Sequence, residues 1–451
     1  MEFDHVVLSR LQFASTAGFH IIFPCLIIGL AFYLTALEIL WLKTKQQIYR
    51  TQFEFWVKPF AAAFIVGVTT GVVLSYQLDT AFGGFYYKTL NILVPIRKIE
   101  FANALLVEAG FFGIMVWGWK KVGDRLHFLA TLMVTAGVIA SAACILARNS
   151  WMQTPDGFLL IDGQLMLDDW LSAVISPSFP YRFAHMLGAA FVSTAFFILG
   201  ISAWLLLKQR SQKFAQFSLR ASLLVILVLT PLQFFSGDLH GLNTKEHQPT
   251  KLAAMEALWD TMEGAPLVLF GVPDQKLEAN RYAVEIPKLA SLIITHELNG
   301  KLIGLKDVPR EERPNVPIVF FSFRIMVGLG LAMLASGVVG LLLWCKGRLY
   351  SSRWYLRVCC SMIPSGFLAT IAGWCVSEAG RQPWVVYGLI KTAEVVVPMD
   401  ASQVVQFLSS IAIAYAVLFS GFVYYLCSVI KRGPTEREDL FAQKPLAELA
   451  G

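Results

Sequence analysis

The chain has 451 residues, of which 56% are hydrophobic and only 15% are charged, with a mean hydropathy of +0.60 and a formal net charge of +6. Soluble domains rarely combine so much apolar sequence with so few charges, so this composition excludes an ordinary soluble globular protein. Because the modest positive charge gathers between apolar segments, it favours a membrane protein over a nucleic-acid-binding one.

Apolar stretches long enough to cross a bilayer recur along the whole chain. They predict an all-α polytopic membrane protein. We expect about nine transmembrane helices near residues 15–42, 54–78, 99–119, 127–148, 182–207, 219–236, 317–345, 355–377 and 403–430.

Lys and Arg residues are concentrated in the segments that follow the odd-numbered spans. These segments are 43–50, 120–125, 208–220, 346–357 and the tail from 431, which includes Arg437 and Lys444. Because basic loops stay in the cytoplasm, we expect an outer N-terminus and a cytoplasmic C-terminus.

The same pattern predicts four regions along the chain. Residues 1–236 hold helices 1–6, residues 237–316 form an outer loop, residues 317–430 hold helices 7–9, and residues 431–451 form a cytoplasmic tail. A loop as long as 237–316 usually carries function or forms a small folded lobe.

Four side chains in or beside the spans are candidate iron ligands. They are His20, His185, Met326 and Glu378. His and Met are familiar haem ligands, and ionisable groups within a membrane are functional candidates by default. Taken singly, such a histidine is as often a structural hydrogen-bonding group, and such a methionine usually packs in a core. In the predicted orientation all four lie in the outer half of the membrane, and this common depth favours one shared site.

The third and fourth spans carry a second polar set. Glu100 and Glu108 are eight residues apart, which is about 12 Å of rise and about 80° of rotation, so both can face one side of a helix. Carboxylates buried at that depth can carry protons, and Ser141 and Asn149 could continue the path. The alternative is a pair of polar helix-packing contacts. Together with Glu378, these carboxylates are also typical of a proton-coupled secondary transporter, which stays open as an alternative function.

Seven short motifs occur in a fixed order. They are SRLQF at 9–13, FH at 19–20, RFAH at 182–185, KLAAMEA at 251–257, FGVPD at 270–274, FRIMV at 323–327 and GWCVSEAGRQPW at 373–384. In these motifs the chain resembles subunit I of the cytochrome bd quinol oxidases, from residue 1 to about 430. The short outer loop resembles the branch called cyanide-insensitive oxidase.

The resemblance implies three haems. By motif match, His185 and Met326 are the axial ligands of a low-spin haem b. His20 and Glu378 serve the two high-spin haems, one of type b and the other either haem d or a third haem b. The residues that surround the haems are Arg324, Trp374 and Arg381.

The resemblance also implies the reaction and the partners. Lys251 and Glu256 match positions for quinol oxidation, and Glu100, Glu108 and Ser141 match a proton path to the oxygen site. Ubiquinol or menaquinol would be oxidised at the periplasmic face. O₂ would be reduced to water with cytoplasmic protons, which generates proton motive force without pumping. The expected partners are a second membrane subunit and a small single-span subunit, in the bacterial inner membrane. A haem–copper oxidase is excluded, because its catalytic subunit needs six histidine ligands in its spans.

Overall fold

The computed structural model describes residues 5–398 and 400–434, so the tail residues Arg437 and Lys444 lie outside the described part. Within it, nine segments are long and apolar enough to cross a membrane, which confirms the predicted fold class. These segments are Val6–Thr44, Gln47–Ala81, Leu90–Lys120, Asp124–Gln153, Trp170–Leu207, Gln212–His247, Arg310–Cys345, Arg353–Ala379 and Ser402–Arg432.

The described residues form sixteen α-helices, and several of them join end to end to make the spans. They are α1 (His5–His20), α2 (Ile22–Thr44), α3 (Gln47–Ala81), α4 (Gly83–Lys88), α5 (Leu90–Asn103), α6 (Gly110–Trp117), α7 (Asp124–Gln153), α8 (Trp170–Val174), α9 (Phe179–Leu207), α10 (Gln212–His247), α11 (Pro249–Glu256), α12 (Leu289–Thr295), α13 (Val316–Cys345), α14 (Arg353–Ser361), α15 (Ser365–Ala379) and α16 (Ala401–Arg432).

Short strands pair only as antiparallel two-stranded ribbons in the part of the chain that is described. The pairs are β1 (Phe158–Ile161) with β2 (Gln164–Leu167), β3 (Met262–Glu263) with β6 (Lys301–Leu302), β4 (Leu267–Asp274) with β5 (Ala279–Ile286), and β7 (Trp384–Val386) with β8 (Ile390–Lys391).

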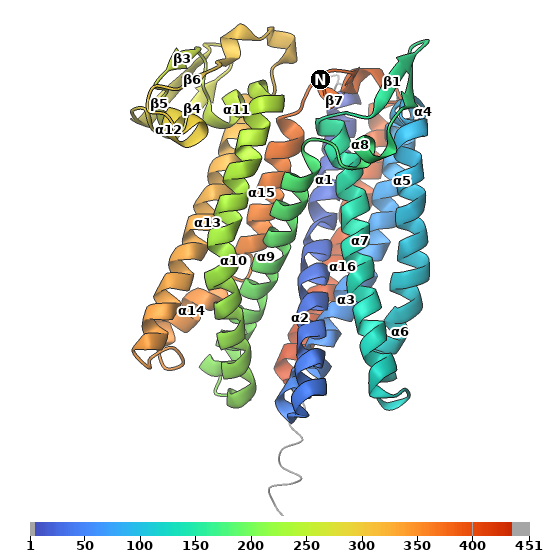
Figure 1. Cartoon of the computed structure of the whole chain (residues 1–451), viewed down its shortest axis with the longest axis vertical. Coiled ribbons are helices and arrows are strands. Elements are labelled where there is room, and N and C mark those ends of the chain that lie inside the picture. The colour runs from blue at the N-terminus through green and yellow to red at the C-terminus, as the bar shows by residue number, and fades with distance from the viewer. Residues whose placement is uncertain (1–4, 399, 435–451) are drawn as a thin grey trace, which may run out of the picture.

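Two ribbons, β3 with β6 and β4 with β5, form a lobe together with helix α12 at one end of the long helices (Figure 1). The start of α1, the hairpin containing β1 and strand β7 lie at this same end, which we call the lobe end. The connections α2–α3, α6–α7, α9–α10 and α13–α14 lie at the opposite end, and they carry the basic segments. That the lobe end faces the periplasm remains a prediction from the charge pattern.

The interior between α2, α3 and α9 is filled with aromatic side chains. Phe23, Trp56 and Phe60 are completely buried. Each buried aromatic removes on the order of 150–250 Å² from solvent. This close aromatic packing fixes the helices that position the polar residues at the lobe end.

The first span is interrupted at His20. Helix α1 ends at His20 and α2 begins at Ile22. A proline has no backbone N–H and clashes with the carbonyl four residues before it, so Pro24 breaks the helix at His20. A candidate ligand therefore sits at a helix discontinuity that the sequence encodes.

A π-helical segment, η1 (Ala104–Ala109), separates α5 from α6 and contains Glu108. The predicted relation between Glu100 and Glu108 assumed a regular α-helix, and this assumption is wrong because six residues follow i→i+5 bonding. Short π segments frequently occur at functional sites. Both carboxylates nevertheless bond to α7, as described below.

Helix α10 continues past the predicted end of the sixth span to His247. The expectation that His240 lies in an outer loop is therefore wrong, because the helix extends through the polar sequence SGDLHGLNTKEH. The rings of His240 and His185 are 5.9 Å apart between centroids. The loop proper starts at α11.

Candidate functional site at the lobe end

Glu378 lies on the last turn of α15 and is the centre of a buried polar cluster. Its Oε2 accepts a hydrogen bond from Arg381 at 2.5 Å, and its Oε1 accepts from Asn149 at 3.1 Å and Gln153 at 3.2 Å. Asn149 and Gln153 are both on α7, one turn apart. The carboxylate is thus fixed between two helices and the turn that follows α15.

Two further cations border this carboxylate. Arg182 on α9 donates to Asn149 and, at 2.8 Å, to Ser377. Lys251 on α11 donates to Gln153 Oε1 at 2.5 Å and to Gln248. Burial, with Arg182 and Arg381 nearby, holds the pKa of Lys251 well below its usual range. Burial also lowers the pKa of Arg381, against the attraction of Glu378.

The cluster has more buried cations than anions among the described residues. Arg182, Lys251 and Arg381 are 8%, 4% and 3% exposed, and Glu378 is the carboxylate among them. Arg381 Nε and Nη1 and Arg182 Nε are buried without an acceptor in the part of the chain that is described. Unpaired buried N–H donors are expensive, so this site fits an additional anionic group such as the propionates of a haem.

His185 lies on α9 and Met326 lies on α13, and both helices pack against α15, the helix that carries Glu378. His185 Nδ1 is 3.1 Å from Ser236 Oγ, and that hydroxyl donates to the Gln233 carbonyl at 3.1 Å. The hydroxyl's one proton is used there, so Ser236 Oγ can accept from a protonated Nδ1, and that tautomer leaves the Nε2 lone pair for a metal. The Gln233 amide nitrogen lies 3.3 Å from both ring nitrogens, so a metal at Nε2 would take the place of that contact.

His20 is held in the same way at the end of α1. Its Nδ1 is 2.8 Å from Thr70 Oγ1, which donates to the Val66 carbonyl at 2.9 Å. Nε2 is again the nitrogen with the lone pair. A ligating histidine usually donates its other N–H to a fixed acceptor, so both histidines fit the role of an iron ligand.

Glycines stand opposite three of the candidate ligands. A Cβ at Gly71 would lie 3.3 Å from His20 Cε1, and one at Gly237 would lie 3.1 Å from His185 Cε1. A Cβ at Gly373 would lie 2.9 Å from Met326 Sδ. Any larger residue at these positions would displace the ligand side chain.

Among the described residues, no group of three or more His, Cys, Asp or Glu side chains could hold a bare metal ion. Haem iron differs in this respect, because the porphyrin supplies four ligands and the protein adds one or two. The lone imidazoles, the thioether and the Glu378 carboxylate therefore fit haem as the cofactor.

Glu100 and Glu108 each bond to α7 but not to each other. Glu100 Oε2 accepts from Arg148 at 2.7 Å, and Glu108 Oε1 accepts from Ser141 at 2.6 Å. Asn103 donates to both Glu108 and Ser141. The predicted association of Ser141 with the glutamates is thus seen for Glu108.

Glu256 and Arg324 connect the lobe to α13. Glu256, at the end of α11, accepts from Arg324 Nη2 at 2.8 Å, and Arg324 Nε donates to the Val268 carbonyl at 2.9 Å. This places α11 and strand β4 against the helix that carries Met326. Of the predicted tryptophans, Trp374 packs against the aromatic core of the bundle.

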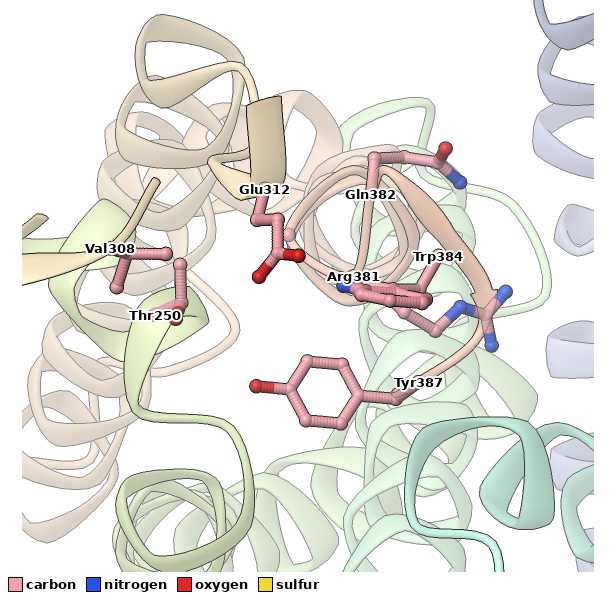
Figure 2. A pocket seen from close by; sticks show the side chains of 8 residues that line it. Thr250, Val308, Glu312, Arg381, Gln382, Trp384 and Tyr387 are labelled. Atoms are coloured by element: carbon pink, nitrogen blue, oxygen red, sulfur yellow. The ribbon is translucent and has the colours of Figure 1, made fainter. Parts of the chain in front are cut away.

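A small cavity of about 30 Å³ lies beside this cluster (Figure 2). It is lined by Thr250, Val308, Glu312, Gly380, Arg381, Gln382, Trp384 and Tyr387. Figure 2 shows the guanidinium of Arg381 turned away from the cavity, while the Tyr387 hydroxyl and the Glu312 carboxylate face it. The volume suits about one water molecule, not a quinol ring.

Four residues that shape the site were not singled out from sequence. Gln153 and Gln248 hold Lys251, and Thr70 and Ser236 orient the two histidines. Glutamine, threonine and serine are common in helices, and their partners lie far away in the chain. A single sequence offers no signal that would have found them.

Comparison with known proteins decides the family. Residues 8–434 match the sequence profile of the family described as cytochrome bd terminal oxidase subunit I. The chain belongs to this family. The resemblance seen in the motifs is thereby confirmed, and membership implies haem cofactors.

Related chains match over nearly their full length. The chain is 33% identical over 441 residues to cytochrome bd ubiquinol oxidase subunit 1 of Bacillus subtilis (strain 168), covering 95% of this chain and 94% of that one. It is 29% identical over 502 residues to cytochrome bd-II ubiquinol oxidase subunit 1 of Escherichia coli (strain K12), covering 96% and 97%.

The fold is similar to that of a solved bd oxidase from Geobacillus thermodenitrificans. The TM-score is 0.88 at 28% sequence identity, over 96% of this chain and 100% of that chain. Cytochrome bd subunit I membership and nine apolar helices in the described residues make this a multi-pass protein of the bacterial inner membrane. The roles of individual residues and the cyanide-insensitive branch stay predictions.

Proposed function

We propose that this chain is the haem-carrying subunit of a terminal oxidase that oxidises quinol at the lobe end and reduces O₂ to water. The reaction is 2 quinol + O₂ → 2 quinone + 2 water. Family membership supports a quinol:oxygen oxidoreductase that works with a second membrane subunit. A small single-span subunit is a further proposed partner.

One observation carries the proposal: a buried cluster in which Arg182, Arg381 and Lys251 outnumber the carboxylate of Glu378, with buried guanidinium N–H groups that lack an acceptor among the described residues. His185 and Met326 would hold a low-spin haem b, and His20 and Glu378 would serve two high-spin haems, of which one is haem d or a third haem b. Bound haem iron would accept electrons from quinol and deliver them to O₂. Arg182, Arg324 and Arg381 would balance the propionates, and Trp374 would help enclose a macrocycle.

Lys251 and Glu256 would act on the quinol. Oxidation of a quinol releases two protons, so the site needs groups that can accept them. The pKa of Lys251 is lowered by burial, which makes its neutral form more accessible than that of an exposed lysine. Glu256, held by Arg324, would fix a quinol hydroxyl or take its proton. Protons released here would leave at the lobe end, which we assign to the periplasm.

Glu108, Ser141 and Glu100 would deliver the protons that O₂ reduction consumes. They line the contacts that α5 and η1 make with α7 within the membrane, and a carboxylate there can hold and pass a proton. Protons drawn from the cytoplasm against 100 mV take up about 2.3 kcal/mol per charge. Proton motive force would therefore form without a dedicated pump.

Optical spectra of the purified complex test this proposal directly. We expect reduced-minus-oxidised haem b bands, with a chlorin band if haem d is present, and quinol-dependent oxygen uptake. Haem b alone would keep the oxidase function and favour the haem-b-only branch. If the complex is folded and has its partners but contains no haem, the proposal is wrong. That result would favour a proton-coupled transporter that uses Glu100, Glu108 and Glu378.

A further inference from the structure

A second buried ionisable pair lies in the half of the bundle away from the lobe. Glu38 on α2 and His127 on α7 are joined by a contact of 2.6 Å between Oε1 and Nδ1. Their side chains are 1% and 3% exposed. Glu38 Oε2 and His127 Nε2 are buried and have no hydrogen-bond partner among the described residues. The function proposed above does not use either residue.

A structural role alone explains this pair poorly. A buried ion pair adds little net stability compared with apolar residues of similar size, because desolvation offsets the attraction. Two further polar atoms are buried there without partners, and that also opposes folding. Ionisable groups that stay buried inside a membrane protein despite this cost in stability usually bind or transfer protons or ions.

The pair is close to water at the opposite end. His127 is only three residues from Asp124, the first residue of α7, and Asp124 forms a half-exposed ion pair with Lys45 at 2.9 Å. The Trp119 ring covers His127 at 4.3 Å between centroids, and Arg50 lies over the Trp119 ring at 5.0 Å. One layer of side chains therefore separates the pair from the aqueous side.

A stripe of hydroxyl groups leads from the pair along α7. Thr131 and Thr135 follow His127 at four-residue spacing, so they lie on one face of the helix. Thr131 Oγ1 donates to the His127 carbonyl at 3.2 Å, and Thr135 Oγ1 donates to the Thr131 carbonyl at 2.8 Å. Thr35 of α2 adds a fourth polar side chain, 2.8 Å from Thr135 between hydroxyl oxygens.

The polar groups then continue on another face of α7, toward the glutamate of the proposed proton path, because residues two apart do not share a helix face. Two residues beyond Thr135, the Gly137 carbonyl accepts from Asn103 at 2.8 Å. The same Asn103 amide donates to Ser141 at 2.8 Å and to Glu108 at 3.2 Å. From His127 to Ser141 the rise is about 21 Å. Polar groups therefore occur along α7 from the opposite end to Glu108, first on the face toward α2 and then on the face toward α5 and η1.

We propose that Glu38 and His127 form a proton-holding site that reloads Glu108 from the cytoplasmic side. This inference rests on the function proposed above. In each cycle the pair loses one proton, which moves over water ordered by the threonine hydroxyls and forms the O–H bond of a protonated Glu108. The pair, left as carboxylate and neutral imidazole, takes up one proton from the aqueous side. No electron is transferred in this step.

The test compares proton uptake with electron delivery in the complete complex. Glu38→Gln keeps a hydrogen bond to His127 but removes the carboxylate charge that holds the proton on the pair. We expect full haem spectra and unchanged anaerobic reduction of the haems by quinol. We expect proton uptake after mixing with O₂, followed with a pH-sensitive dye, to slow by at least about tenfold. Glu38→Asp should restore part of the rate.

Two more variants separate this role from a structural one. Thr135→Val removes one hydroxyl at nearly constant volume and should also slow proton uptake. If Glu38→Gln does not fold, this variant alone tests the proposed proton transfer. Ser202→Ala removes a buried hydroxyl on α9, away from the stripe, and should have no effect. Unchanged proton uptake in folded Glu38→Gln or Thr135→Val, or equal slowing in Ser202→Ala, would overturn the inference. Failure of the proposed function would look different, because the unmodified complex would then lack haem or quinol-dependent oxygen uptake.

Discussion

The lobe-end half of the bundle and the opposite half handle charge differently. At the lobe end, Glu378 is surrounded by Arg381 and Arg182, with Lys251 linked through Gln153. The opposite half contains an aromatic core and, in the described residues, the buried pair of Glu38 with His127. The first arrangement fits the binding of anionic cofactors, and the second fits occasional passage of single protons. Under the proposed function, the difference means that the chemistry is placed at the lobe end and that its protons come across from the opposite end.

The largest effect should come from removing the anion at the lobe end. Glu378→Ala would remove a proposed iron ligand and leave Arg381 buried without its carboxylate. Breaking a buried pair in this way costs about 3–5 kcal/mol. We expect loss of a high-spin haem signal, loss of oxygen uptake and a lower thermal midpoint, measured by optical spectroscopy and calorimetry. Retention of every haem signal with full oxygen uptake would remove Glu378 from the site.

Met326→Leu should separate the low-spin haem from the others. Leucine matches methionine in volume, so packing changes by less than about 1.5 kcal/mol, but it cannot ligate iron. We expect the low-spin spectrum to disappear while the high-spin bands remain. Met333→Leu is the matched control, because Met333 is buried on the same helix and carries no proposed role. Equal spectra for the two variants would rule out Met326 as a ligand.

Thr70→Val tests how His20 is oriented. Without the hydroxyl, His20 loses the acceptor that fixes its Nδ1 proton, and such losses weaken metal binding or activity by about 10–100-fold. We expect reduced occupancy of one high-spin haem, read by pyridine haemochrome stoichiometry. The neighbouring Thr69→Val removes an exposed hydroxyl that bonds only to the Ile65 carbonyl, so it should keep full haem content. Full occupancy in Thr70→Val would mean that His20 needs no such support.

The smallest effect should be in the lobe itself. The Arg313 guanidinium, together with Arg310, holds the pKa of Glu278 below its usual range. A carboxylate with a lowered folded pKa stabilises the fold above its unfolded pKa of about 4.3, and this contribution is lost as the pH falls through the folded pKa.

Glu278→Gln should therefore make the lobe more sensitive to limited proteolysis near neutral pH, with the difference from the unmodified protein vanishing on acidification. The effect should be small, because Arg310 is exposed and ion pairs at the surface contribute little. Glu285→Gln, on the exposed face of β5, is the control and should match the unmodified protein. A pH-independent difference would show that Glu278 acts through shape alone.

Much of the fold could be predicted from the sequence because membrane spans follow from hydropathy alone. The nine apolar runs and the motif residues His185, Met326 and Glu378 were evident. The extension of α10 to His247 was missed because its last turns, with Asp238 and Lys245, look like a loop. Hydropathy does not register a helix that continues into polar surroundings.

The partners in the site could not be predicted. Glu38 meets His127 across 89 positions of sequence, and Gln153 meets Glu378 across 225. Such contacts depend on how whole helices pack, and the π segment around Glu108 depends on the same packing. No local pattern in one sequence encodes them.

The most direct test of the account is the side from which protons are taken. The purified complex would be reconstituted in one orientation in vesicles, with the lobe end identified by protease access, and driven with quinol and O₂. We predict acidification at the lobe end, proton uptake from the opposite end and a membrane potential that an uncoupler abolishes. Proton uptake and release both at the lobe end, with no potential, would contradict it.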